Sequence, residues 1–330
     1  MASTTSQTVP TPRSAALAAK ASSGLLLLAF AAVYILWGST YFFIRVGVET
    51  MPPFVLAGLR HVIIGLVFYP VFRRLTGEKP TLGQWRTTAI TGLLLLLCGN
   101  GAVSWAETRV PSGIAALLVA SVSLWMVIVD WLRPGGLRPT ARVLAGFFIG
   151  FAGIALLVGP AKLGGARVSP LGALTLVLAS LAWASGSIYS RHHPIPHSPM
   201  LGVAMQSLAG GLGLSLVALL TGEVREFHPA SVAMRSWLAV LYLIIFGSAL
   251  GFSAYVYILK HSTPSRVATY AFVNPAVALF LGWGLGGEPL TLRTLLASGI
   301  ILAAVLLVIT APHHVAAPPE EEIVPVCSES

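Results

Sequence analysis

The chain has 330 residues, of which 56% are hydrophobic and 9% are charged, and its formal net charge is +9. Soluble domains carry about 25% charged residues, so this composition excludes a protein whose surface faces mainly water. The basic residues lie between apolar segments and form no cluster with aromatic residues, so we expect no nucleic-acid partner. Cys98 lies in an apolar run and Cys327 in a polar one, so no disulfide is expected.

Apolar runs of about 20 residues, each long enough to cross a bilayer, follow one another along the chain. Residues 1–23, rich in Ser, Thr and Ala, are predicted to form an N-terminal tail. We predict ten membrane-spanning helices at residues 24–46, 54–72, 87–108, 111–132, 141–159, 170–190, 199–220, 236–259, 264–285 and 291–310. The connections are too short for a soluble domain. Residues 311–330 gather Pro and Glu, and we expect a disordered tail there.

The distribution of Lys and Arg predicts the orientation. If the N-terminus is inside, twelve of these residues fall on the cytoplasmic side and seven on the other, with Arg60 inside a span. The first half of the chain carries most of this bias. We therefore expect both termini, and both tails, in the cytoplasm.

An internal repeat divides the chain into residues 24–159 and 160–310. Trp37, Tyr41 and Arg45 are spaced four residues apart, and the second half repeats this spacing with Trp183, Ser187 and Arg191. The triplet Thr-Gly-Glu at 76–78 returns at 221–223. Chance similarity between apolar segments is the alternative explanation.

Each repeat holds five predicted helices, which is an odd number. The second repeat must therefore enter the membrane from the side opposite to the first. We predict an all-α membrane protein in which ten transmembrane helices form two inverted five-helix repeats. Many secondary transporters are built in this way.

Four sequence motifs resemble those of the EamA-type branch of the drug/metabolite transporter superfamily, and within it the YedA-like inner-membrane exporters. They are YILWGSTYFFIRVGVE at 34–49, GNGAVSWAE at 99–107, VPSGIAA at 110–116 and YAFVNPAVA at 270–278. The resemblance implies two inverted five-helix repeats in the inner membrane and export of metabolites, such as amino acids, or of toxic compounds. It does not imply a particular substrate.

The chain departs from this family's pattern in the fourth predicted helix. Relatives commonly read Ala-Thr-Val-Pro-Leu where residues 120–124 here read Ala-Ser-Val-Ser-Leu. Ser123 therefore stands in place of a helix-kinking proline. Its presence puts in doubt how freely this helix bends and which substrates fit beside it.

Two acidic residues lie within or at the ends of predicted spans. A carboxylate in lipid costs about 2.5 kcal/mol or more, so each should face the protein interior or the interface. Glu107 could bind a cationic substrate group or a coupled proton, or pair with Arg109 or Arg60. Asp130 lies beside Trp131 and Arg133, so we expect it to form an interfacial ion pair.

Arg60 and several other polar residues are predicted inside the membrane. A buried arginine can bind a substrate carboxylate bidentately, although a side chain that extends toward the interface is the alternative. Asn274 precedes Pro275 in the middle of a predicted span, where a kink would leave a carbonyl free beside the amide. The candidate substrate-binding residues are Trp37, Tyr41, Arg60, Asn100, Trp105, Glu107, Trp183, Tyr270 and Asn274.

Glycines interrupt the third and eighth predicted helices. Glycine weakens a helix and allows close approach, which suits a hinge or a cavity wall, and small-residue helix packing is the alternative. The candidate hinge residues are Gly99, Gly101, Gly247, Gly251 and Pro275.

Known enzyme and cofactor motifs are absent from the sequence. There is no P-loop, no His-Glu-x2-His and no Gly-x-Ser-x-Gly, so we expect neither catalysis nor ATP-driven pumping. His192, His193 and His197 lack regular ligand spacing and are expected to be exposed rather than metal-binding. No cofactor or metal is expected.

A secondary transporter that works by alternating access is therefore the leading hypothesis. Its partners would be the lipid bilayer and a small-molecule substrate, with a coupled proton as an option and with monomer or homodimer left open. A passive channel or facilitator and a membrane-embedded lipid-modifying enzyme are the alternatives. The enzyme would need clustered acids or histidines at one interface, and the sequence offers only Glu107 and Asp130, on opposite sides.

Overall fold

The computed structural model describes residues 12–136, 138–159, 168–262 and 269–310. Within these residues every regular element is helical. The predicted tail at 311–330 and part of the predicted span 264–285 lie outside the described residues.

The first half of the bundle contains these elements: α1 (Pro12–Val48), α2 (Pro53–Thr76), α3 (Leu82–Gly92), η1 (Leu93–Gly101), α4 (Ala102–Ala106), α5 (Ser112–Val119), α6 (Val122–Leu132) and α7 (Ala141–Val158). The second half contains α8 (Pro170–Arg191), α9 (Pro199–Leu220), α10 (Glu223–Glu226), η3 (Pro229–Ser231), α11 (Met234–Tyr242), η4 (Leu243–Leu250), α12 (Gly251–His261), α14 (Tyr270–Gly284) and α15 (Leu292–Ile309).

The helices have the length and composition of membrane spans. Among the described residues, nine helical stretches are long and apolar enough to cross a bilayer, and α14 is a shorter apolar helix. Large hydrophobic side chains such as Leu27, Phe148 and Leu220 are exposed on the outside of the bundle. The prediction of an all-helical membrane protein is therefore confirmed.

Two helix starts differ from the predicted boundaries. The first helix begins at Pro12, so it extends into the segment predicted as a tail. The third begins at Leu82 rather than at residue 87, because Thr81 and Gln84 form a reciprocal capping box. In it, Gln84 N donates to Thr81 Oγ1 at 3.3 Å and Thr81 N donates to Gln84 Oε1 at 2.8 Å.

The fourth predicted span, 111–132, is not one continuous helix. It divides into α5 and α6 at Ala120 and Ser121. The Ser121 hydroxyl donates to the Leu118 carbonyl at 2.6 Å, a local bond that competes with regular helix pairing. The helix therefore breaks close to Ser123 without the family's usual proline.

Two spans contain long π-helical segments in their middle. In the third span η1 lies between α3 and α4, and in the eighth η4 lies between α11 and α12. A π-helical stretch is rare and frequently occurs at functional sites. Three of the glycines predicted as interruptions lie in these segments, Gly99 and Gly101 inside η1 and Gly247 inside η4, and Gly251 directly follows η4.

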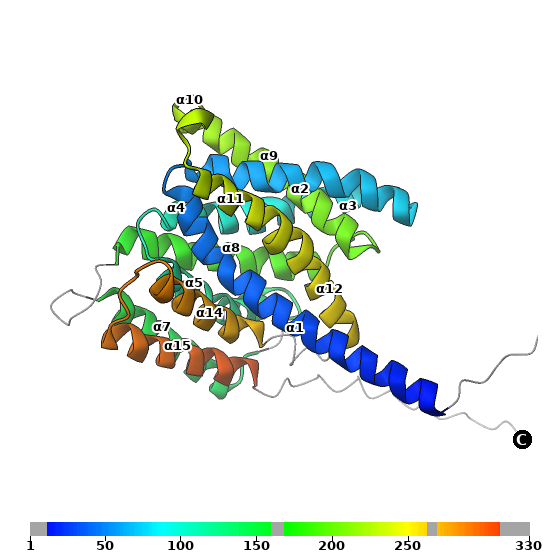
Figure 1. The fold of residues 1–330 in the computed structure, drawn as a ribbon. Coiled ribbons are helices and arrows are strands. Elements are labelled where there is room, and N and C mark those ends of the chain that lie inside the picture. Colours follow the sequence, from blue (N-terminus) through cyan, green and yellow to red (C-terminus); the bar gives the residue numbers. More distant parts are fainter. Residues whose placement is uncertain (1–11, 137, 160–167, 263–268, 311–330) are drawn as a thin grey trace, which may run out of the picture.

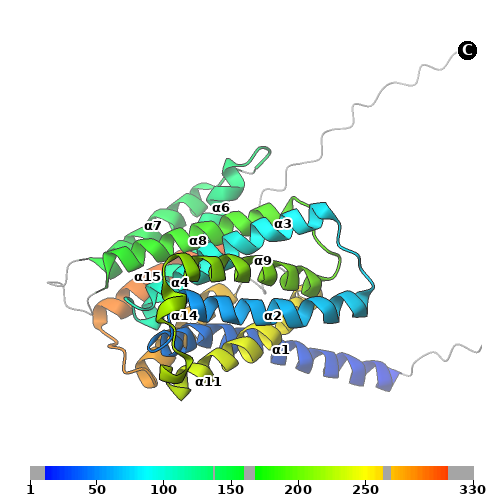
Figure 2. The same ribbon diagram turned by 90° about the horizontal axis from the view of Figure 1, so that it is seen from above.

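The helices pack in matched pairs across the two halves. Helix α2 lies along α9, and α7 lies along α15 (Figures 1 and 2). Helix α1 contacts α14, η4 and α12, while α8 contacts α5, α6, η1 and α4. Thus α1 and α8, the first helix of each half, both pack against helices of the other half.

Helices α2 and α9 are joined by two reciprocal caps. Helix α2 is followed by Gly77, in the left-handed conformation at φ 67°, and the next residue, Glu78, accepts the Ser198 N–H at the start of α9 at 2.8 Å. Helix α9 is followed by Gly222, at φ 84°, and by Glu223. One Glu223 oxygen accepts the Phe54 and Val55 N–H groups at the start of α2, at 2.8 and 3.1 Å.

These caps stabilise helix ends that would otherwise have unpaired N–H groups. Burial raises the pKa of the Glu223 carboxyl, while the two backbone N–H groups act in the opposite direction and favour its charged form. The repeated Thr-Gly-Glu triplets therefore have the same structural task in both halves.

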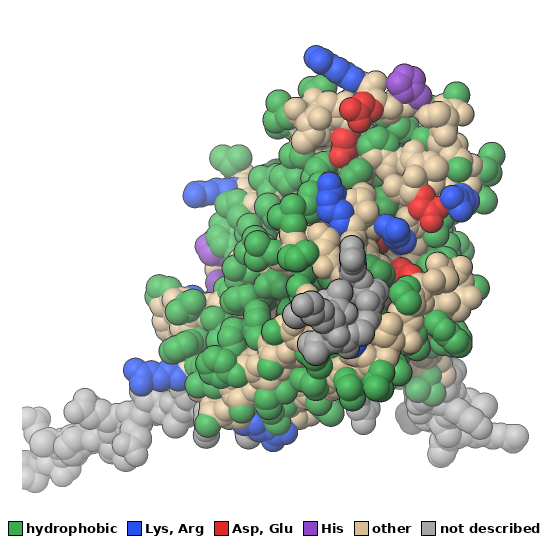
Figure 3. Space-filling view, turned by 90° about the vertical axis from the view of Figure 1, so that its left-hand side faces the viewer, with side chains coloured by type: hydrophobic (Ala, Val, Ile, Leu, Met, Phe, Trp, Pro, Cys, Tyr) green, Lys and Arg blue, Asp and Glu red, His purple; other side chains and the backbone are tan. Residues whose placement is uncertain are grey.

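The main hydrophobic core lies at one end of the bundle, which we call the Glu107 end. This end carries the connections around Glu107 and Glu288, and it faces the viewer in Figure 3, where charged side chains are interspersed among apolar ones. Fully buried side chains such as Met51, Leu117 and Leu243 belong to this core. A smaller cluster around Val33 and Ile258 lies toward the opposite end.

Candidate functional site

A cavity of about 150 Å³ lies between the two halves. Most of its lining is apolar or aromatic, and helices from both halves contribute to it. Its lining residues include Trp37, Thr40, Tyr41, Arg60, His61, Leu96, Gly99, Asn100, Ser180, Trp183, Gly247, Phe252, Tyr270, Asn274 and Pro275.

Arg60 brings a charge into this cavity from α2. Its side chain is 4% exposed, and its Nε donates to the Ser248 hydroxyl in η4 at 3.0 Å. Its Nη1 is buried and has no hydrogen-bond partner among the described residues. Arg60 therefore points inward, and the alternative in which its side chain extends to the interface does not describe this structure.

Neutral polar groups complete the cavity's polar lining. Nε2 of His61 and the side-chain oxygens of Asn100 and Asn274 are buried and have no hydrogen-bond partner within the described part of the chain. Buried polar groups are normally paired, because an unpaired one costs about 1–3 kcal/mol. Several unpaired polar atoms around one cavity are therefore characteristic of a site that binds a polar ligand or water.

Trp37 closes one wall of the cavity against η4. Its indole N–H donates to the Gly247 carbonyl at 3.1 Å, and its ring packs against the rings of Tyr255 and Tyr270, with centroids 4.8 and 5.5 Å away. A Cβ added at Gly251 would lie 2.5 Å from the Trp37 ring nitrogen. Glycine at this position is therefore required by the close approach of the indole.

Trp183 makes the corresponding contact in the other half. A Cβ added at Gly99 in η1 would lie 2.9 Å from Cε3 of its ring. Trp37 and Trp183 are the repeated tryptophans of the sequence, and each packs on a glycine of the other half: Trp183 on Gly99 inside η1, and Trp37 on Gly251, the residue directly after η4. Gly101 faces elsewhere, since its added Cβ would meet Leu214.

Asn274 and Pro275 lie in α14 and face the cavity as a pair. Both are buried, and Pro275 is inside the helix. Proline cannot donate a backbone hydrogen bond, so it weakens the helix beside the Asn274 amide.

Glu107 lies beyond the cavity, at the C-terminal end of α4. It is 0% exposed, and both of its carboxylate oxygens are buried without a hydrogen-bond partner among the described residues. Neither predicted pairing is present. Arg109 stacks on Trp105, 4.0 Å from the ring centroid, and Arg60 faces the cavity. Arg45 instead donates to the backbone carbonyl of Glu107.

Glu288 is the acidic neighbour of Glu107. Its two oxygens accept the Ser112 and Gly113 N–H groups at 2.6 and 3.1 Å and so cap the start of α5. The Glu107 carboxyl interacts electrostatically with one negative group, Glu288, and one positive group, Arg45.

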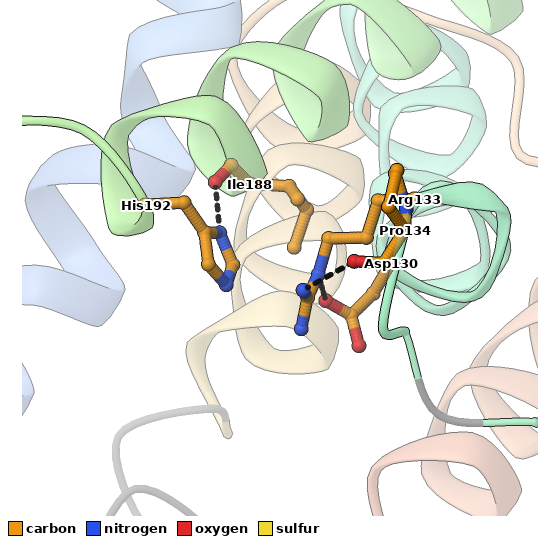
Figure 4. Close-up of polar contacts among 5 residues, drawn as sticks. All are labelled: Asp130, Arg133, Pro134, Ile188 and His192. Atoms are coloured by element: carbon orange, nitrogen blue, oxygen red, sulfur yellow. Dashed lines mark hydrogen bonds and ion pairs between the residues drawn. The ribbon is translucent and has the colours of Figure 1, made fainter.

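The predicted ion pair of Asp130 is present. Arg133 Nε donates to Asp130 at 2.7 Å, and both side chains are about 30% exposed (Figure 4). His192 and His193 are exposed, and His192 Nδ1 lies 2.9 Å from the Ile188 carbonyl in the same view. Among the described residues, no group of three or more His, Cys, Asp or Glu side chains could hold a metal ion.

The structure brings together most of the residues predicted for the site. The cavity lining contains all but four of the predicted binding and hinge residues, and those four are Trp105, Glu107, Gly101 and Gly251. Four residues at the site were not among the predicted site residues: His61, Ser180, Ser248 and Phe252. Of these, Ser248 lies between two glycines already predicted as hinges, so its position in that segment was the available signal.

The fold and the site define a multi-span membrane protein with a polar internal cavity. The EamA-like transporter family matches residues 22–159 and again residues 170–310. The chain therefore belongs to the EamA-like transporter family, whose members are transporters rather than enzymes.

Several relatives are similar over most of their length. The "Uncharacterized inner membrane transporter YedA" of Escherichia coli (strain K12) is 41% identical over 273 residues, which are 82% of this chain and 86% of that protein. The "Probable amino-acid metabolite efflux pump" of Salmonella typhimurium is 26% identical over 279 residues, 82% of this chain and 90% of that protein. A crystal structure with 22% identity superimposes with a TM-score of 0.58, covering 87% of this chain and 98% of the other. That likeness supports the fold.

Proposed function

We propose that this protein is a secondary transporter of the inner membrane that exports small metabolites through the cavity by alternating access. The observation that carries the proposal is the cavity itself, which is lined from both halves and contains an arginine and several unpaired polar atoms. A protein with only a structural role would not maintain such groups in its interior. The relative named as an efflux pump for amino-acid metabolites supports export of that class of compound.

The two halves, residues 24–159 and 160–310, are proposed to be inverted repeats. The reciprocal caps between α2 and α9 and the matching contacts of Trp37 and Trp183 support this arrangement, because each joins equivalent residues of the two halves. Inverted repeats allow the halves to exchange conformations and so to open the cavity to either side in turn. The π-helical segments η1 and η4 are the proposed points of bending.

The described conformation is proposed to be closed toward the Glu107 end, because the main core is packed there. With both termini in the cytoplasm, as the Lys and Arg distribution favours, this end faces outward. The conformation would then be an inward-facing one.

Glu107 is the proposed proton-coupling residue. It is buried, its carboxylate has no partner within the described residues, and it lies close to Tyr41, which lines the cavity. A buried carboxylate between Glu288 and Arg45 is sensitive to small changes in its surroundings. A conformational change that alters those neighbours would therefore bind or release a proton.

The proposal is tested by counterflow in proteoliposomes and by the growth of overexpressing cells on a panel of toxic amino-acid analogues and drugs. Saturable counterflow, together with resistance to at least one compound, is expected. A flux that rises linearly with concentration and shows no counterflow would support the passive channel instead. Flux at the level of protein-free liposomes for every compound would contradict transport.

A further inference from the structure

Among the described residues that line the cavity, Arg60 is the charged one, and part of its guanidinium has no hydrogen-bond partner there. Arg60 has its Nε bonded to a neutral hydroxyl, that of Ser248, while its Nη1 is buried without a partner among the described residues. A buried guanidinium is normally paired with a carboxylate, because an uncompensated buried charge is costly. The open Nη1 edge of Arg60 is therefore suited to an anionic group of a ligand.

No carboxylate of the described chain compensates this charge. None of the described residues that line the cavity is Asp or Glu. His61, next to Arg60, can add only positive charge, and Asn100 and Asn274 are neutral. A monoanionic ligand would make the occupied site neutral, whereas a zwitterion would leave it with a net positive charge and with a buried ammonium that has no counter-ion.

The unpaired amide oxygens specify a second feature of the ligand. Asn100 and Asn274 each have a buried side-chain oxygen without a hydrogen-bond partner in the described part of the chain. Such an oxygen accepts a hydrogen bond and is satisfied by a hydroxyl or an amide N–H of the ligand. A neutral donor near the ligand's carboxylate would therefore pair with groups that are now unpaired.

Size and wall chemistry limit the rest of the ligand. The cavity volume of about 150 Å³, at roughly 15 Å³ for each water-sized group, holds about ten non-hydrogen atoms. Trp37, Trp183, Phe252 and Tyr270 form aromatic walls. Such walls favour a flat apolar body, since aromatic side chains stack on rings.

We infer that the cavity binds a small monocarboxylate anion, with an aromatic or other apolar body and a neutral hydrogen-bond donor beside the carboxylate, in preference to a zwitterionic amino acid of the same size. This inference rests on the proposed function for its biological meaning. The binding chemistry can be measured without any transport.

Equilibrium dialysis of the purified, detergent-solubilised full chain with radiolabelled mandelate tests the inference. Mandelate has a carboxylate, a hydroxyl and a phenyl ring. Phenylglycine replaces its hydroxyl by an ammonium, and mandelamide replaces its carboxylate by a neutral amide. Mandelate is expected to bind, and each competitor is expected to displace it with at least about tenfold lower affinity. Equal or tighter binding of phenylglycine, or no binding of mandelate, would overturn the inference.

Substitutions of Arg60 test whether this side chain binds mandelate. Arg60→Gln should weaken mandelate binding by about 10- to 100-fold, which is the loss expected for a charge-assisted hydrogen bond. Arg60→Lys keeps the charge without the planar fork, so it should retain the preference for mandelate over phenylglycine at reduced affinity. Arg235→Gln is the matched control, because Arg235 is 66% exposed and pairs with Glu49 outside the cavity, and it should bind as the unmodified protein does.

The results separate this inference from the proposed function. Mandelate binding that depends on Arg60, without any flux in proteoliposomes, would support the anion site and contradict transport. Resistance and counterflow with other compounds, without mandelate binding, would support transport and contradict the anion site. Unchanged mandelate affinity in Arg60→Gln would contradict the role of Arg60 whatever the flux.

Discussion

Substitution of Gly251 by alanine tests whether the contact between Trp37 and the eighth span matters for function. The added methyl would lie 2.5 Å from the indole nitrogen and 2.8 Å from Cδ1 of Trp37. The Trp37 ring cannot move away easily, because the rings of Phe252, Tyr255 and Tyr270 pack against it. The contact must therefore open, and the Trp37 bond to the Gly247 carbonyl is expected to break with it.

Overpacking of this kind costs about 1–3 kcal/mol, which corresponds to a fall in the melting temperature of roughly 2–6 °C. If the contact belongs to only one of two alternating conformations, the same energy shifts their populations by about 5- to 150-fold. The melting temperature in detergent and the rate of substrate exchange in proteoliposomes measure the two effects. Both are expected to fall.

Gly299→Ala is the matched control, because a Cβ at Gly299 in α15 meets nothing within 4 Å. Alanine there should be neutral or stabilise the helix by up to about 1 kcal/mol. Gly99→Ala should reproduce the exchange defect through Trp183. The reasoning would be refuted if Gly251→Ala left both the melting temperature and the exchange rate unchanged, or if Gly299→Ala lowered them as much.

Three further substitutions separate the other roles assigned above. Glu107→Gln cannot bind or release a proton, so flux driven by a pH gradient should be lost while downhill exchange persists; gradient-driven flux at the unmodified rate would remove the coupling role. Glu223→Ala leaves two N–H groups of α2 without a cap, so it should lower the stability of the fold by about 1–2 kcal/mol. The loss should be larger than that of Glu78→Ala, which leaves one N–H group of α9 without a cap. Thermal melts compare the two variants, and the reverse order would contradict the cap assignment. Asp130→Asn removes an ion pair whose side chains are about 30% exposed and which is worth at most about 1 kcal/mol, so stability and flux should stay close to those of the unmodified protein. A large loss of either would contradict this expectation.

Hydrophobicity and repeated residues predicted most of the fold. The apolar runs identified the spans because a bilayer of fixed thickness requires a fixed length of helix. The repeated spacing that contains Trp37 and Trp183 pointed to two tryptophans that each pack on a glycine of the other half. The start of the third helix was misplaced, because Thr81 and Gln84 begin it with a polar capping box that a hydrophobicity pattern does not contain.

The site was predicted less completely, and the reason is geometric. Arg60, Asn100 and Asn274 stand out as polar residues in apolar runs, so the sequence identifies them. Which side a residue of a buried helix faces depends on the packing of the other helices, so the inward direction of Arg60 and the outlying position of Trp105 were not accessible. The break between α5 and α6 at Ala120 and Ser121 was also missed, because neither proline nor glycine marks it in the sequence.

The reciprocal caps made by Glu78 and Glu223 affect the order in which the helices can be completed during synthesis. The N–H groups of Phe54 and Val55 receive their cap from Glu223, which lies 169 and 168 positions later, so the first half leaves the ribosome with one helix start unsatisfied. That helix can be completed only after α9 has been synthesised and inserted beside it, and α9 in turn needs Glu78 from the half already made. We expect each half alone to insert less stably into the membrane than the whole chain does. Two separately translated halves should recover their stability when they are produced together.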